Sequence, residues 1–484
     1  MKKKEELFYL IKSLSKSEKR HFKLQHHRSN SNYLRLFDAI DKQQIYDEQR
    51  IKDQFSNERF TKQLHSSKNH LRQLIYQSLR QYHKTISIDA QVKDLLRTVE
   101  ILYQKELLQH AEQELNKAHR LAVDYELDVI IIEIKRWQRI LLQARQPNHH
   151  AAIKDLLDQE STLVENLQRN FQQWQLIIQS IGGGDKAMLK RLSEQIKQTN
   201  HEKLSVHAKV LHACTQAHLS LYKNDVNSVT NVLNDAIQAM QNAAHLLHEK
   251  PQPYVALINN LAYFHAITQE HEKALSLLDL ALKLFEESQS GNNNKLLVKE
   301  IARSHLVELD IYLQHESPEE YLTKIQANTQ FCKNHQHQLP DDYKVRFYYQ
   351  LGLLYFKLNN DRQALHWLGK LISCKASTYL ELHFNGRLLN LMIHARLKNY
   401  IALGYFATNT RRFFRQHKLL KPWVRRLLLT VEKLGQHPES QLSRVYQQLH
   451  LRLFPENSVS IIPETTLKHI PIENWLTELR INAK

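Results

Sequence analysis

The sequence predicts an all-α protein in which helical hairpins stack side by side as a right-handed solenoid. It has nine Gly and ten Pro in 484 residues, which is few for a chain rich in turns. No proline precedes Pro147, and five of the ten lie at or beyond Pro422. Because proline breaks helix interiors, the first two-thirds should be long helices joined by short polar turns. The abundant residues, Leu, Gln, Lys, His, Ala and Asn, mostly tolerate or favour helix.

The first 88 residues are expected to form a separate helical head or an atypical cap. Five helices are predicted there, at residues 5–14, 18–24, 32–41, 48–55 and 60–83. None of them carries the repeat pattern that appears further along the chain. Residues 1–88 are therefore interpreted as a basic N-terminal helical head.

A repeated pattern of small and large residues begins after the head. Residues 348–368 read YYQLGLLYFKLNNDRQALHWL, with an aromatic, then Leu-Gly, then Tyr, then Ala, at Tyr348, Leu351, Gly352, Tyr355 and Ala364. Residues 258–281 supply a second copy through Leu261, Ala262, Ala274, Leu278 and Ala281. Weaker copies carry Ala217, Val229, Leu233 and Ala236, and earlier Leu102, Ala111, Leu115 and Ala118.

This pattern resembles the tetratricopeptide repeat (TPR), a helix–turn–helix unit. Small residues let the two helices of a hairpin approach closely, and larger ones fill the gap to the next hairpin. The copies depart from the family at Leu371, where a small residue is expected, and at His265 and Ile258, where aromatics are expected. The resemblance implies a binding scaffold whose concave groove takes a peptide or another protein, and it does not imply catalysis.

The repeat spacing is longer than the usual 34 residues of a TPR unit. Ala274 and Ala364 are 90 residues apart, or two units of about 45, and Ala111 and Val229 are 118 apart, or three units near 39. We therefore expect longer helices and about eight hairpins between residues 90 and 455. Turns are expected at Asp225, 359–361 and 398–399, and a longer loop at 288–295. The predicted domains are the head at 1–88, a TPR-like α-solenoid at 89–455, and an extended tail at 456–484 with a short helix at 474–481.

Motifs for catalysis, nucleotide binding and zinc proteases do not occur in the sequence. Two groups of soft metal-ligand residue types deserve a test: His207, His212, Cys214 and His218, and separately Cys332, His335 and His337. On one helix, His207, Cys214 and His218 would share a face without a visible fourth zinc ligand, so ordinary repeat packing is the favoured interpretation of the first group. For the second group, a polar loop is favoured. The glycine triplet at 182–184 is interpreted as a turn between helices. We expect no enzyme activity, no cofactor and no metal site.

Residues 383–431 contain ten Lys or Arg and no acidic residue. Within them, residues 411–426 read RRFFRQHKLLKPWVRR. Helical spacing favours Phe413 and Phe414 as core residues. Two interpretations stay open: a solvated positive flank paired with acids of another repeat, or an anion-binding surface. The candidate binding residues are Arg411, Arg412, Arg415, Lys418, Lys421, Arg425 and Arg426.

A second acid-free run spans residues 59–88. A continuous helix over 60–83 would align Lys62, Arg72 and Arg80 on one stripe with His65, Asn69 and Tyr76. With the preceding helix, this is weakly similar to a helix-turn-helix whose second helix enters a major groove. The first 90 residues hold 19 basic and 10 acidic residues. Their surplus and that of residues 383–431 together exceed the formal charge of +17 of the whole chain, so the middle of the chain is close to neutral.

Two functions follow as expectations. The first is a non-catalytic interaction scaffold that binds a protein or peptide in the groove of the solenoid. The alternative is a nucleic-acid-binding regulatory protein, with a basic head coupled to a TPR-like sensor. The start MKKKEELFYLIKSLSK lacks the apolar core of a signal peptide, no stretch approaches the ~20 apolar residues that span a bilayer, and the three cysteines are scattered. We expect a soluble cytoplasmic protein without a membrane partner.

Overall fold

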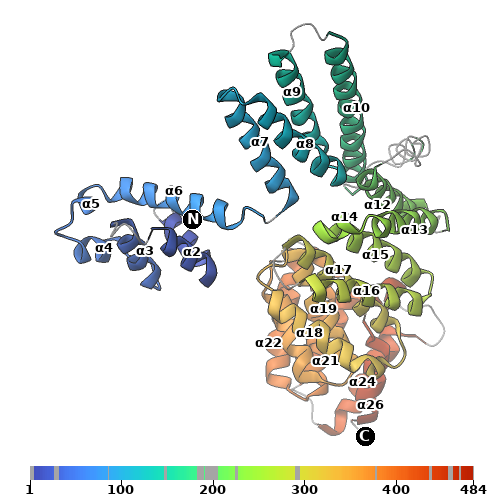
Figure 1. Ribbon diagram of the computed structural model, residues 1–484. Helices are drawn as coiled ribbons and strands as arrows, with labels where there is room; N and C mark the ends of the chain where they lie inside the picture. Colours follow the sequence, from blue (N-terminus) through green and yellow to red (C-terminus); the bar gives the residue numbers. More distant parts are fainter. Residues whose placement is uncertain are drawn as a thin grey trace. The chain divides into compact units, whose positions relative to one another are not determined.

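The computed structural model confirms the all-α fold class (Figure 1). It describes residues 5–26, 32–85, 87–145, 150–181, 190, 194, 205–223, 227–288, 295–375, 379–434, 439–455, 462–467 and 470–482. Every regular element in this part of the chain is a helix. The chain divides into two compact units, Met1–Trp174 and Gln175–Lys484.

The head contains six helices: α1 (Glu6–Ser13), α2 (Lys16–His26), α3 (Asn32–Lys42), α4 (Glu48–Gln54), α5 (Arg59–Lys62) and α6 (Leu64–Tyr82). Local sequence explains where two of them begin. Ser15 and Glu18 form a capping box at the start of α2, because the Glu18 N–H donates to Ser15 Oγ (3.2 Å) and the Ser15 N–H donates to Glu18 Oε2 (2.6 Å). Asp47 caps α4 by accepting from the N–H groups of Gln49 and Arg50. Phe22 and Phe37 pack at the centre of the head's core.

The prediction of one continuous helix over 60–83 is wrong. The chain leaves helical geometry at Gln63 (φ −120°, ψ 39°), which separates α5 from α6. The Thr61 hydroxyl donates to the Phe55 carbonyl at 2.6 Å, and the rings of Phe55 and Phe60 lie 5.2 Å apart in the core. These contacts tie the four-residue α5 to the preceding turn. Lys62 is therefore outside the helical register of α6, and the predicted stripe does not include it.

The rest of the chain is a series of consecutive helix pairs. The first two pairs are α7 (Ile88–Gln104) with α8 (Leu108–Asp124), and α9 (Asp128–Arg145) with α10 (His150–Ile181). Six more follow: α12 (Val206–Lys223) with α13 (Asn227–Asn242), α15 (Pro251–Ile267) with α16 (His271–Ser288), α17 (Lys295–Gln314) with α18 (Leu322–His335), α19 (Asp341–Lys357) with α20 (Asp361–Ser373), α21 (Leu380–Arg396) with α22 (Tyr400–Gln416), and α23 (Pro422–Lys433) with α24 (Glu439–Leu453). The expected number of about eight hairpins is confirmed for the described residues.

Four further elements whose bounds the structure describes lie outside these pairs: α14 (Ala244–Glu249), the 3₁₀ helix η2 (Pro318–Tyr321), α25 (Glu464–Leu467) and α26 (Ile472–Asn482). The last of them, α26, lies where the sequence predicts a short helix at 474–481. The indole Nε1–H of Trp475 donates to the Met392 carbonyl of α21 at 2.9 Å. This contact joins the C-terminal helix to the solenoid.

The predicted unit of about 45 residues is confirmed in the second half of the chain. The first helices of four successive pairs begin at Val206, Pro251, Lys295 and Asp341, at intervals of 45, 44 and 46 residues. Ala111 lies in α8 and Val229 in α13, and α10 between them is 32 residues long. The division of this stretch into three units stays a prediction, because most of residues 182–204 lie outside the described residues.

Many of the helices end at a residue that has a left-handed backbone conformation but is not glycine. In each case the following residue donates its N–H to the carbonyl five positions earlier, as Glu270 does to His265 (2.8 Å) and Asn360 to Tyr355 (2.9 Å). This is the Schellman C-cap, in which glycine is the usual left-handed residue. Here the left-handed residues, with φ between 50° and 65°, are Glu106, Glu126, Gln269, Asn359, Lys398 and Lys418. The chain thus closes its hairpins with few glycines.

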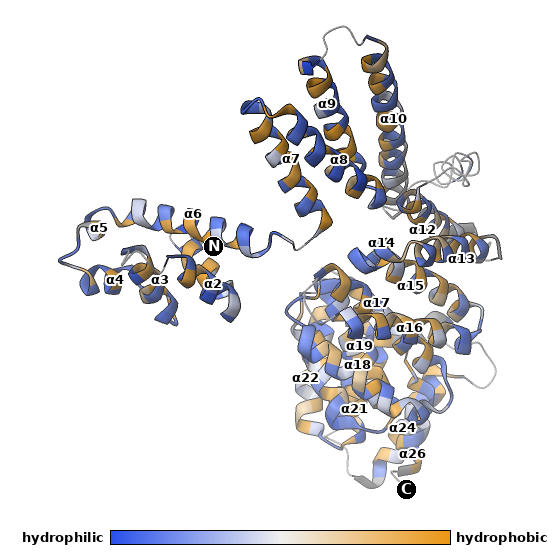
Figure 2. Ribbon diagram, in the orientation of Figure 1, coloured by the Kyte–Doolittle hydropathy of each residue, from blue (hydrophilic) through white to orange (hydrophobic). Residues whose placement is uncertain are grey.

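The small residues of the repeat lie between packed helices. Figure 2 shows that the helices contain both polar and apolar residues, as amphipathic packing requires. The residues assigned to repeat packing are all buried: Leu261, Ala262, Ala274, Ala281, Leu351, Gly352, Tyr355 and Ala364. A Cβ on Gly352 would lie 2.7 Å from Leu368 Cδ2, so α19 and α20 approach closely there. The predicted turns at 359–361 and 398–399 join α19 to α20 and α21 to α22. Asp225, residues 182–184 and most of the predicted loop at 288–295 lie outside the described residues.

Candidate functional site

Polar side chains of successive first helices meet across the second half of the solenoid. Asn260 of α15 donates to Cys214 Sγ of α12 at 3.5 Å, and Arg303 of α17 donates to Asn260 Oδ1. Further along, Gln350 of α19 donates to the carboxylate of Asp310 of α17. The partners are 40 to 46 residues apart, which matches the repeat spacing. We call these five residues the polar seam. Three hydrogen bonds join these side chains and fix the register of the helices, although Gln350 Oε1 is buried without a hydrogen-bond partner in the described part of the chain.

The histidines and cysteines considered as metal ligands do not converge. No group of three or more His, Cys, Asp or Glu suited to a metal occurs among the described residues. Burial raises the pKa of the Cys214 thiol to about 11 and that of Cys332 to about 12. Both thiols are therefore neutral at physiological pH and are weak nucleophiles. The rings of His335 and Phe331 pack 4.6 Å apart.

A cationic surface lies on the hairpin of α22 and α23. Six of the seven candidates from residues 411–426 are exposed, and none of the six makes an ion pair within the described part of the chain. We call them the basic hairpin: Arg412, Arg415, Lys418, Lys421, Arg425 and Arg426. Arg411 is different, because its Nη1 lies 3.2 Å from Glu432 Oε2. That carboxylate, one residue beyond the acid-free run, also accepts from the Thr408 hydroxyl at 3.3 Å.

The aromatic residues between these cations face inward. Phe414 and Trp423 are buried, and both lie near the ring of Phe384 from α21, at 4.7 and 6.1 Å. Phe413 lies under the guanidinium of Arg387, which is 4.0 Å from the ring centroid. The prediction that the Phe pair packs into the core is confirmed for Phe414, while Phe413 is half-buried. The aromatics hold the hairpin on α21 and leave its cations outside.

The turn of the basic hairpin is rigidly hydrogen-bonded. Lys418 takes the left-handed conformation (φ 57°), and Leu419 donates its N–H to the Phe414 carbonyl at 2.8 Å. Lys421 donates to the Leu419 carbonyl at 2.9 Å, and Pro422 begins α23. The positive end of the α23 dipole therefore lies within the same cationic surface. An anion near Lys421 would feel both charges.

The basic run of the head is partly neutralised by contacts within the head. Arg72 Nη1 lies 3.2 Å from Glu6 Oε2, and Lys68 Nζ lies 2.9 Å from Glu48 Oε2. Arg80 is exposed on α6, and Lys62 is exposed on α5 in a different register. The structure therefore does not align Lys62, Arg72 and Arg80 as one free basic stripe.

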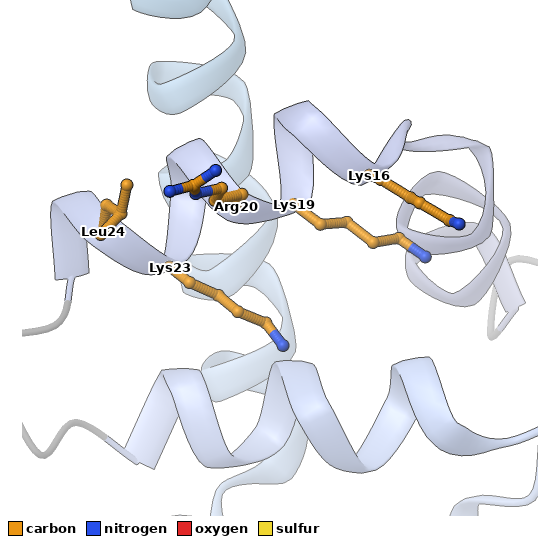
Figure 3. A pocket seen from close by; sticks show the side chains of 5 residues that line it. All are labelled: Lys16, Lys19, Arg20, Lys23 and Leu24. Atoms are coloured by element: carbon orange, nitrogen blue, oxygen red, sulfur yellow. The ribbon is translucent and has the colours of Figure 1, made fainter.

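Besides the basic hairpin, the structure has a cationic surface in the head that the sequence analysis did not predict. A shallow hollow of about 370 Å³ on α2 is lined by Lys16, Lys19, Arg20, Lys23 and Leu24. Figure 3 shows these five side chains. Lys19 pairs with Asp41 at 2.7 Å and Lys23 with Asp38 at 2.6 Å, both from α3. The sequence contains a pattern that could have predicted this surface. Lys16 and Arg20, and Lys19 and Lys23, are four residues apart, which puts each pair on neighbouring turns of one helix. Two of the four cations on α2 form ion pairs with carboxylates of α3. The basic hairpin therefore keeps more unpaired positive charge than the surface of α2.

No protein-family model matches the sequence, and no curated protein matches it. None of the helices in the described part of the chain is both long and apolar enough to cross a membrane.

Proposed function

We propose that this protein is a non-catalytic, cytoplasmic interaction scaffold of the TPR type, and that its basic hairpin binds an acidic segment of another protein. The observation that supports this is the set of six exposed cations that lack carboxylate partners within the described part of the chain. Like charges held together on a rigid hairpin create a positive potential that attracts anionic partners and speeds their association. The partner's carboxylates would supply the counter-charge that the hairpin lacks.

The TPR assignment is supported by the packing of the repeats. Gly352 and Ala364 lie where α19 and α20 meet, in the order that the TPR pattern has. The units are longer than those of the family because the helices have about 17 to 20 residues. The polar seam, which joins successive first helices, is already internally bonded. We therefore assign partner binding to the basic hairpin rather than to a groove formed by these helices.

A protein partner is favoured over nucleic acid by the position of the aromatics. Proteins that bind single strands combine cations with exposed rings on which bases stack. Here Phe414 and Trp423, which lie between the cations, are buried, and the exposed ring of Tyr405 lies two helical turns before Arg412. In the head, the pairing of Arg72 with Glu6 removes a charge from the predicted groove-reading stripe. The three cysteines are free, in keeping with a reducing compartment.

The test is affinity capture with the full-length chain, with and without nuclease, read by mass spectrometry. The test variant carries Arg412→Glu, Arg415→Glu, Arg425→Glu and Arg426→Glu. The control carries Lys250→Glu, Lys283→Glu, Lys333→Glu and Arg362→Glu, which change the net charge equally at exposed positions outside α22 and α23.

We expect a nuclease-resistant acidic partner that the control retains and the test variant loses. Capture that disappears after nuclease treatment, with a duplex affinity that falls steeply with salt, would establish the nucleic-acid alternative instead. Equal capture by both variants would remove the basic hairpin from the function.

A further inference from the structure

The exposed face of α22 changes from apolar to cationic along its length. At its start, Ile401 is 94% exposed and Tyr405 is 68% exposed. Leu397, in the turn before the helix, is 49% exposed. Large apolar side chains that stay in water on a protein surface mark contact sites when they gather in one place. Ile401 and Tyr405 are one helical turn apart on α22, and Leu397 is four residues before Ile401 in the sequence.

The apolar and cationic ends belong to one face of the helix. Residues 401, 405, 408, 412 and 415 follow the spacing of four, three, four and three that keeps side chains on one side of an α-helix. Ile401, Tyr405, Thr408, Arg412 and Arg415 are all exposed or partly exposed along it. Eleven residues separate Ile401 from Arg412, which corresponds to roughly 16 Å along the axis at 1.5 Å per residue.

We infer that the partner of the basic hairpin docks as an amphipathic helix, with apolar side chains on Ile401 and Tyr405 and carboxylates about three turns away on Arg412 and Arg415. The inference rests on the proposed function and deepens it, because it names the class of segment that is bound. Charge complementarity selects carboxylates for one end, and the removal of Ile401 and Tyr405 from water selects apolar side chains for the other.

The secondary structure of the partner follows from the backbone of α22. Its N–H and C=O groups are used within the helix, and the stripe offers no row of side-chain amides to an extended peptide. An extended segment would keep its own backbone groups unpaired as it displaced water. A helix brings its backbone groups already bonded and can lay its face along α22.

The test uses two fluorescein-labelled 18-residue helical peptides of identical composition. In the segregated peptide, leucines on one face lie about three turns from a cluster of glutamates. In the interleaved peptide, the same residues alternate along the face. Binding to the full-length chain is measured by fluorescence anisotropy at low salt.

We expect the segregated peptide to bind at least tenfold more tightly than the interleaved one. Ile401→Ser should weaken the segregated peptide about tenfold or more, because burial of an isoleucine is lost, and should leave the interleaved peptide unchanged. Arg412→Glu with Arg415→Glu should weaken both peptides. Ile267→Ser, at an exposed position of α15, is the matched control and should change neither.

Ile401 is almost fully exposed, so its replacement by serine should not disturb folding, and thermal melts of each variant check this. If both peptides bind equally and depend only on the arginines, the amphipathic-helix inference is wrong while the proposed function stands. If neither peptide depends on Arg412 and Arg415, both the inference and the proposed function fail.

Discussion

The side chain of Leu371 in α20 occupies the space that a side chain on Gly386 of α21 would need. A Cβ built on Gly386 would overlap Leu371 Cδ2, and Leu371 is itself fully buried. Leu371 stands where the TPR pattern expects a small residue. The small residue has thus moved to the next helix, so that the two helices still approach closely.

Replacing Gly386 with alanine should destabilise the solenoid by about 1 to 3 kcal/mol, because the added methyl overpacks the contact. Leu371→Ala alone should cost about 2 to 5 kcal/mol through the cavity it leaves. The double variant should lose less than the sum of the two, since the new methyl partly fills the new cavity. Urea denaturation of the four proteins measures this coupling.

Gly369→Ala is the control for this experiment. Gly369 lies in the interior of the same helix as Leu371, and nothing lies within 4 Å of a Cβ built there. Alanine should therefore stabilise the helix, by up to about 1 kcal/mol. Additive effects of Gly386→Ala and Leu371→Ala would show that the two positions do not share one space.

The left-handed turn between α15 and α16 should accept glycine with a gain in stability. Gln269 has a φ of 65°, which is sterically unfavourable for a residue with a Cβ. We expect Gln269→Gly to raise the free energy of unfolding by about 0.5 to 1 kcal/mol. Ser276→Gly, at an exposed interior position of α16, should lower it by a similar amount. A destabilised Gln269→Gly protein in urea melts would contradict the role assigned to this turn.

The pairing of Glu48 with Lys68 should make the head less stable in acid. The hydrogen bond from Lys68 is the main cause that lowers the pKa of Glu48 from 4.5 to about 2. A carboxyl whose folded pKa is depressed stabilises the fold above its unfolded pKa, and this stabilisation is lost as pH falls toward the folded value. Protection of the α4 and α6 amides against hydrogen exchange should therefore fall between about pH 5 and pH 2.

Glu48→Gln should flatten this pH dependence, measured by hydrogen-exchange mass spectrometry of the full chain. Asp53→Asn is the matched control, because Asp53 lies on the same helix but accepts a hydrogen bond from Gln49 instead of pairing with Lys68. The same acid response in wild type and Glu48→Gln would assign the pH dependence to other groups.

The three cysteines should react with iodoacetamide in a defined order. Burial raises the pKa of Cys332 to about 12 and that of Cys214 to about 11. Burial also raises the pKa of Cys374, but less strongly, and Cys374 lies partly exposed at the end of α20. Because the thiolate is the reactive form, Cys374 should be labelled first in the native protein. Peptide mass spectrometry follows the three rates, and unfolding in urea should equalise them. Early labelling of Cys332 would contradict its placement in the core.

By itself, the sequence determined the helical class, the 45-residue period and the small residues of the repeats. Each of these depends on spacing within one or two helices, as with Gly352 and Ala364, and local spacing fixes which face of a helix is apolar. Most head helices were predicted within a few residues for the same reason. The sequence analysis did not predict the break at Gln63, because the break depends on the hydrogen bond from the Thr61 hydroxyl to the Phe55 carbonyl.

Only the tertiary structure decided which cations have partners. Arg411 and Arg412 are neighbours in a basic run, yet the first pairs with Glu432 and the second faces water. Arg72 pairs with Glu6, 66 residues away. Such contacts depend on how two helices are rotated and how far apart they pack, and helical periodicity carries no information about a neighbouring helix.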